Sequence, residues 1–180
     1  MVGVRRASAY SKKIVTPYTR KSKVKSKNYI KAVPAQKIVK FEMGNINGYK
    51  EGIFKHRIKL ISEINVLVRD LALEAVRQDL QNRLQKELIN AYYLSCRVFP
   101  HQVLRNNKTF SGGTKGERIQ SGMKHSFGST IGRGAPVKQG QTIFLIAFQN
   151  KKSTAMIRAL CKSSTPKLPG KIKILYEEVK

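Results

Sequence analysis

Apolar residues recur at intervals of three and four between positions 64 and 84, and this spacing predicts one long amphipathic helix. The stripe comprises Ile64, Leu67, Val68, Leu71, Ala72, Ala75, Val76, Leu80 and Leu84. Ser62 is a candidate N-cap. Five of the chain's ten acidic residues, Glu63, Asp70, Glu74, Asp79 and Glu87, fall within this predicted helix of residues 63–87. We expect them on a mixed-charge outer face that meets solvent or protein, with Asp79 pairing with Arg83 four residues on.

Shorter segments rich in β-branched and aromatic residues predict strands at 37–43, 53–61, 92–99, 142–148 and 171–176. The segment 142–148 is almost continuously apolar, which is typical of a central strand covered on both faces. A second, short helix is predicted over 153–160. His56 is interpreted as a surface or edge side chain. This order predicts an α+β fold with a mixed or antiparallel sheet and two helices.

Charge narrows the class of partner. The chain has 36 lysines and arginines against 10 acids, a formal net charge of +26. Such an excess repels itself, so a polyanionic partner is expected to neutralise it, with nucleic acid favoured. An anionic membrane is a weaker alternative: no apolar run approaches the roughly 20 residues of a spanning helix, and the start of the chain does not resemble a signal peptide.

The first forty residues carry much of this charge and no acid; the first acidic residue is Glu42. We predict a basic N-terminal arm over residues 1–35, followed by a single domain over 36–180. The alternative is a solvated tail, but interleaved tyrosines favour an arm that becomes ordered on RNA. Its candidate RNA-binding residues are Arg5, Arg6, Tyr10, Lys12, Lys13, Arg20, Lys21, Lys23, Lys25 and Lys27.

Between Pro100 and Gly140 the sequence is rich in glycine and cations and has little periodicity, so we predict a long internal loop centred on 105–121. No phosphate-binding glycine motif is present. Between residues 88 and 176 the only acid is Glu117, which disfavours a magnesium site or a hydrolase triad. His101 and His125 lack metal-ligand partners at suitable spacing. We therefore predict no enzyme, metal, cofactor or small-molecule substrate.

Cys96 and Cys161 lie in apolar settings, so we interpret them as buried thiols of a reducing cytoplasm. Two other functions remain open on these grounds. A DNA-compacting protein would explain the charge but not the long glycine-rich loop. An RNA-modifying enzyme would need a cofactor pocket, for which the sequence offers no motif.

Three segments together resemble the L10e branch of the L16/L10e ribosomal proteins: 98–105 (VFPHQVLR), 118–128 (RIQSGMKHSFG) and 136–141 (PVKQGQ). Segments 7–18, 32–38, 43–45 and 167–172 are also similar, so the resemblance covers nearly the whole chain in consistent order. The loop lacks the cysteine and the alanine–asparagine sequence of eukaryotic members, and the chain ends soon after the last predicted strand. Both features favour an archaeal or reduced source.

This resemblance implies an α/β-hammerhead-type domain bound to large-subunit rRNA beside the tRNA path, in contact with neighbouring ribosomal proteins. It also implies that a glycine-rich loop over 106–118 points towards the peptidyl transferase region and P-site tRNA, which would be a transient partner. Further rRNA-binding candidates are Arg105, Arg118, Lys124, His125 and Arg133. The candidate tRNA-proximal residues are Asn106, Lys108, Gly112, Gly113, Lys115 and Gly116.

Overall fold

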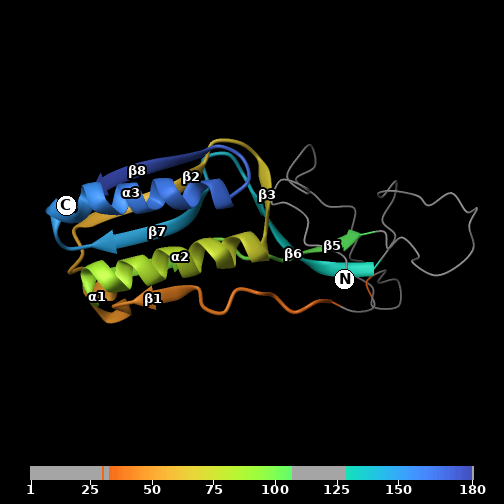
Figure 1. The fold of residues 1–180 in the computed structure, drawn as a ribbon, viewed down its shortest axis with the longest axis horizontal. Coiled ribbons are helices and arrows are strands. Elements are labelled where there is room, and N and C mark those ends of the chain that lie inside the picture. The colour runs from red at the N-terminus through yellow and green to blue at the C-terminus, as the bar shows by residue number, and fades with distance from the viewer. Residues whose placement is uncertain (1–29, 31–32, 107–128, 180) are drawn as a thin grey trace, which may run out of the picture.

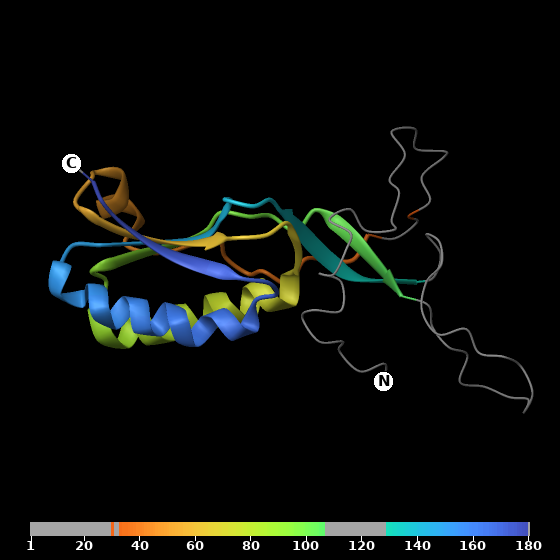
Figure 2. The same cartoon turned by 90° about the horizontal axis from the view of Figure 1, so that it is seen from above.

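Two antiparallel sheets organise the chain, as seen in the computed structural model, which describes residues 30, 33–106 and 129–179. The larger sheet has the strand order β1-β4-β7-β2-β8, and the smaller has the order β3-β6-β5. Helices α2 and α3 lie side by side over one face of the larger sheet, and the smaller sheet extends from the far end (Figures 1 and 2). The predicted mixture of helices with antiparallel strands is therefore confirmed.

The larger sheet contains most of the strands that the sequence predicts, with shifted ends. Its members are β1 (Glu42–Gly44), β2 (His56–Ser62), β4 (Tyr92–Cys96), β7 (Thr142–Phe148) and β8 (Ile172–Glu178). β7 lies between β4 and β2 with almost all of its side chains buried, as its apolar run predicted. Residues 37–40 do not join the sheet. Two of their backbone N–H groups bond instead to acidic side chains of α2, that of Lys37 to Asp70 and that of Val39 to Glu74.

The long helix α2 (Asp70–Leu88) begins eight residues after the predicted N-cap, Ser62. The intervening Val66–Arg69 form β3, and all four side chains are buried. A short run buried on both sides and rich in valine suits a strand, and apolar spacing alone cannot distinguish it from a helix turn. The hydroxyl of Ser62 instead donates to the carbonyl oxygen of Ile64 at 2.7 Å.

The smaller sheet corrects the prediction of an unstructured stretch between Pro100 and Gly140. β5 (Gln102–Asn106) and β6 (Ser129–Val137) pair as a hairpin, and β6 also pairs with β3. Glycine at 132 and 134 weakens the strand signal of β6 in the sequence. Gly134 lies so close to Leu67 that an added Cβ would be 3.2 Å from its Cγ, so the small residue allows the two strands to pack.

The main core fills the space between the larger sheet and the helices α2 and α3 (Thr154–Ser164). Leu73, Val76, Leu80 and Leu84 of α2 are completely buried there. Burying each such side chain stabilises the fold by roughly 1.5–3 kcal/mol. Two short 3-10 helices, η3 (Lys151–Ser153) and η4 (Thr165–Lys167), flank α3.

A second, smaller apolar cluster lies on the opposite face of the larger sheet, under a short helix that the sequence analysis did not predict. This helix, α1 (Ile46–Lys50), is capped by Asn45, whose Oδ1 accepts the N–H of Gly48 at 2.8 Å. The ring of Tyr49 stacks on Tyr93 with centroids 4.0 Å apart. α1 thereby covers the part of this face that β4 and β7 form (Figure 2).

Three single residues test the predictions for buried groups. His56 is only 7% exposed, which corrects its assignment to the surface or an edge: β2 lies between β7 and β8. Its Nδ1 is 2.9 Å from the hydroxyl of Tyr176. Cys96 and Cys161 are both buried free thiols, as predicted. Burial raises the pKa of Cys96 to about 11 and that of Cys161 to about 12.

Candidate nucleic-acid interface

The predicted RNA-binding residues fall into two groups. Arg105 and Arg133 lie in the β5–β6 hairpin, together with the backbone of Asn106. The others lie outside the described residues: Arg5, Arg6, Tyr10, Lys12, Lys13, Arg20, Lys21, Lys23, Lys25, Lys27, Lys108, Gly112, Gly113, Lys115, Gly116, Arg118, Lys124 and His125. For both groups the assignment to RNA stays a prediction.

The β5–β6 hairpin fixes where the predicted loop leaves the fold. Asn106 and Ser129 are register partners, and Arg105 pairs with Thr130. The hairpin lies at the end of the molecule opposite the C-terminus (Figure 1). The two ends of the segment between residues 106 and 129 are therefore held together on a rigid ladder, away from the main core.

Arg133 connects this hairpin to the end of the predicted arm. Its Nε donates a hydrogen bond of 2.6 Å to the carbonyl oxygen of Pro34. The guanidinium thus serves a structural contact in addition to its predicted role on RNA. Pro34 is the penultimate residue of the predicted arm, and Arg133 is the register partner of Val103, so the contact holds that residue against the β5–β6 hairpin. Residue 34, at the end of the predicted arm, therefore lies against the hairpin from which the predicted loop leaves.

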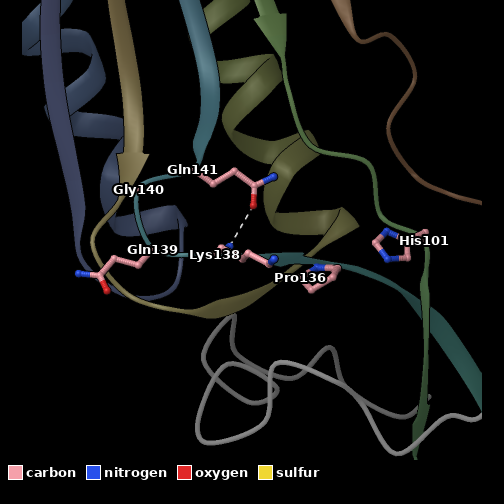
Figure 3. A pocket seen from close by; sticks show the side chains of 6 residues that line it. All are labelled: His101, Pro136, Lys138, Gln139, Gly140 and Gln141. Carbon is pink, nitrogen blue, oxygen red and sulfur yellow. Dashed lines mark hydrogen bonds between the residues drawn. The ribbon is translucent and has the colours of Figure 1, made fainter.

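A surface hollow lies where the two sheets meet, and two segments that resemble the L10e ribosomal proteins line it (Figure 3). Its lining residues are His101, Pro136, Lys138, Gln139, Gly140 and Gln141. The side chains of His101, Lys138 and Gln139 are exposed. They add a cation and hydrogen-bonding groups where the hairpin joins the larger sheet, and the sequence analysis did not predict them as site residues. The sequence feature that these residues share is their place in segments 98–105 and 136–141, which both resemble the L10e ribosomal proteins.

Local hydrogen bonds hold this hollow in shape. The backbone N–H of Lys138 donates to Oε1 of Gln141 at 2.9 Å, drawn in Figure 3, and that of Gln139 donates to Oδ1 of Asn65 at 2.8 Å. His101 has Nδ1 at 3.1 Å from the carbonyl oxygen of Phe99. Because a carbonyl only accepts, Nδ1 carries the proton in this contact, which leaves Nε2 available to a ligand.

The acids of α2 follow the prediction of a mixed-charge outer face only in part: Glu87 is exposed, whereas others are buried. Asp70, Glu74 and Arg77 are buried, with Glu74 and Arg77 paired at 2.6 Å. Asp79 pairs with Arg83 at 3.0 Å, as predicted, and also with Lys167 at 2.9 Å. These hydrogen bonds lower the pKa values of Glu74 and Asp79, Arg77 being the main cause for the first and Lys167 for the second. Internal partners thus compensate these acids.

Metal sites and membrane-spanning helices are both absent from the described residues. Among residues 30, 33–106 and 129–179, no group of three or more histidine, cysteine, aspartate or glutamate side chains is arranged to hold a metal ion. No helix in the same residues is long and apolar enough to cross a membrane.

Comparison with known proteins identifies the family. The family described as ribosomal protein L16p/L10e matches residues 15–175. Three relatives, each named large ribosomal subunit protein uL16, come from archaea. The protein of Pyrobaculum neutrophilum is 37% identical over 175 residues, covering 97% of this chain and 92% of its own. That of Methanococcus maripaludis strain S2 is 37% identical over 155 residues, covering 86% of each chain. That of Methanospirillum hungatei is 34% identical over 152 residues, covering 84% of this chain and 86% of its own.

These matches extend over the strands of both sheets and over the helices, so the similarity is not confined to the basic segments. Members of this family are structural components of the ribosome, where rRNA and other ribosomal proteins surround them. The ribosome is a cytoplasmic particle, in agreement with the compartment expected from the thiols. The chain therefore belongs to the ribosomal protein L16p/L10e family and is a structural constituent of the large ribosomal subunit, not an enzyme.

Proposed function

We propose that the chain binds large-subunit rRNA through the end of the molecule that the β5–β6 hairpin forms, beside the tRNA path and the peptidyl transferase region. The observation that carries the proposal is the hydrogen bond from Arg133 to Pro34, which ties the last part of the predicted arm to the hairpin from which the predicted loop leaves. Phosphate contacts by lysine and arginine dominate affinity for RNA, so gathering two acid-poor segments at one end concentrates that affinity there.

In this proposal the chain divides into a basic arm over residues 1–35 and an α/β-hammerhead-type domain over 36–180. The internal loop predicted over 105–121 has its first two residues in β5. The arm contributes lysines and arginines to phosphates and Tyr10 to stacking. Arg105, Arg118, Lys124, His125 and Arg133 contact rRNA around the hairpin. The glycine-rich part of the loop reaches P-site tRNA, where missing side chains at Gly112, Gly113 and Gly116 permit close approach of the backbone.

The hollow of Figure 3 extends this interface along the junction of the sheets. Lys138 supplies a cation, and His101 and Gln139 supply hydrogen-bonding groups suited to base edges or 2′-hydroxyls. The imidazole of His101 bonds to the carbonyl oxygen of Phe99, and the backbones of Lys138 and Gln139 bond to Gln141 and Asn65. Binding therefore orders only the side chains of Lys138 and Gln139, which limits the conformational entropy that is lost.

Salt-dependent binding tests the proposal. The full chain should bind a protein-free transcript of large-subunit rRNA, and its affinity should fall by roughly 10³–10⁵ between 50 and 200 mM salt if about 6–10 phosphates are contacted. A double change, His101→Ala with Lys138→Ala, should weaken this binding while the melting temperature stays unchanged. Equal affinity for a DNA duplex of the same length would instead favour sequence-neutral DNA compaction and contradict the proposal.

A further inference from the structure

The outer face of helix α3 is cationic and lies apart from the hairpin interface. Its exposed basic residues are Lys151, Lys152, Arg158 and Lys162, and we refer to these four as the α3 cationic face. The sequence from 151 to 167 contains no acidic residue. α3 begins at the end of the molecule opposite the β5–β6 hairpin (Figure 1). The start of this face is therefore separated from the hairpin by the length of the larger sheet.

On the neighbouring helix α2, an acidic side chain neutralises an exposed arginine. On α2, Arg83 stands four residues after Asp79 and pairs with it at 3.0 Å. On α3, Arg158 and Lys162 have the same spacing but the same sign, which destabilises a helix. Asp79 does reach across from α2, but to Lys167 in η4. Lys151 has Glu178 at 3.9 Å, an exposed and therefore weak pair.

A shallow hollow of about 390 Å³ opens beside this face, between the start of α3 and β8. The residues that line it are Lys151, Lys152, Thr154, Ala155, Arg158 and Tyr176. Three of these side chains are cations and none is an acid. The carboxylate of Asp79 lies at the other end of α3, where it accepts a hydrogen bond from Ser164. An anion in this hollow would therefore contact the cations of Lys151 and Lys152 in η3 and of Arg158 in α3.

The remaining exposed residues of α3 indicate which polyanion fits. They are Ala155, Ala159 and Ser163. Protein partners are usually held by buried aromatic or large aliphatic anchors, and the exposed residues of α3 include none. Small residues between cations instead allow a sugar–phosphate backbone to lie directly on the helix while lysine and arginine reach the phosphates on either side.

We propose that the α3 cationic face binds a segment of rRNA backbone that is distinct from the RNA at the hairpin. This inference rests on the proposed rRNA-binding function and adds a second anchoring surface to it. The protein would then bridge two RNA segments, one at each end of its long axis. None of the four residues contacts a base in this arrangement, so the surface contributes affinity and orientation but no sequence preference.

The salt dependence of binding tests this surface with a matched control. Arg158→Ala/Lys162→Ala removes two cations of the face, while Lys50→Ala/Lys86→Ala removes two exposed cations from α1 and α2. Binding of each full-length variant to the protein-free large-subunit rRNA transcript is measured as a function of salt. The α3 variant should lose about 1 from the slope of log K against log salt for each phosphate contact removed, so about 2 in total. The control should keep the slope of the unchanged protein.

Site-specific crosslinking provides a second readout. Both native cysteines are buried with raised pKa values, so a cysteine introduced by Ala155→Cys can be labelled selectively with a photocrosslinker. In large subunits that carry the labelled chain, this cysteine should crosslink to rRNA, whereas a cysteine introduced by Asn82→Cys, at an exposed position of α2, should not. Arg158→Gln/Lys162→Gln replaces the alanine variant if that variant melts at a lower temperature.

The outcomes separate the two proposals. If the unchanged protein does not bind the transcript, the proposed function itself fails. If it binds with the expected salt dependence but the α3 variant keeps the same slope, only the second surface is overturned. A crosslink from position 155 to a ribosomal protein and not to RNA would likewise overturn it, by assigning the face to an acidic protein partner.

Discussion

The guanidinium of Arg77 donates two hydrogen bonds to the carboxylate of Glu74, at 2.7 Å from Nε and 2.6 Å from Nη2. Both side chains are nearly buried, at 8% and 11% exposure. The same carboxylate accepts the backbone N–H of Val39 at 3.4 Å, while Arg77 also donates to Sδ of Met43 at 3.1 Å. One buried ion pair thus joins α2 to β1 and to the extended segment that leads away from the arm.

Removing one partner of this pair should be costly. Glu74→Gln leaves the guanidinium of Arg77 buried without its counter-charge, and the free energy of unfolding should fall by about 3–5 kcal/mol. Urea denaturation at neutral pH measures the loss. The same change at Glu87, which is exposed on the same helix, should stay within about 0.5 kcal/mol. Equal effects at the two positions would show that the buried pair contributes nothing.

Acidification should destabilise the protein through Glu74 and Asp79. Their pKa values are lowered from ordinary values of 4.5 and 3.8, so folding favours the ionised forms. The corresponding stability is fully present above about pH 5 and is lost as the pH falls through the lowered values. Urea midpoints at pH 7, 5 and 3 should decrease in that order. Asp79→Asn should lower the midpoint at pH 7 and flatten the acid-dependent decrease; an unaltered decrease would contradict the assignment.

Substitutions at two glycines with positive φ, Gly44 and Gly52, should distinguish the cost of backbone strain from the cost of a steric clash. At Gly44, φ is +83° and an added Cβ would lie 2.3 Å from the backbone oxygen of Tyr92. At Gly52, φ is +77° with no atom within 4 Å of that position. Gly52→Ala should therefore cost only the left-handed conformation, about 1–2 kcal/mol. Gly44→Ala should cost clearly more, because β1 must move from β4. Thermal melting compares them, and equal losses would argue against the clash.

Deletion of residues 110–115 should separate folding from function. The hairpin below the loop is held by register pairs from Gln102–Gly134 to Asn106–Ser129, so the melting temperature should change little. Translation by ribosomes that carry the shortened chain should be impaired, since the loop is proposed to reach tRNA. A replacement of equal length by glycine and serine serves as control for spacing. Unfolding of the deleted form would show that the loop is structural.

Sequence periodicity predicted the parts of the fold that are regular over a long range. The body of α2 and the central strand β7 both follow from apolar spacing, because each buries one continuous stripe or run. The same spacing was wrong at Val66–Arg69, where apolar residues on both sides fit a strand as well as a helix. What decides the outcome is pairing with β6, a segment more than sixty residues later in the chain, which local patterns do not contain.

The candidate site was predictable only in outline. Charge indicated a polyanionic partner, and the resemblance of short segments indicated the ribosome. Neither could place Arg133 against Pro34, which lie 99 residues apart in sequence. Nor could they bring His101 next to Lys138, because the junction of two sheets creates that neighbourhood. The sequence contains the acid-free stretch 151–167, but only the structure shows that four of its basic residues are exposed and form the α3 cationic face.

Sedimentation of the full chain with ribosomal particles tests most directly whether phosphate contacts to large-subunit RNA anchor this protein. A tagged chain should co-sediment with free large subunits and with assembled ribosomes in a sucrose gradient at low salt, and only high salt should release it. Recovery at the top of the gradient at low salt, or together with small subunits, would contradict the account.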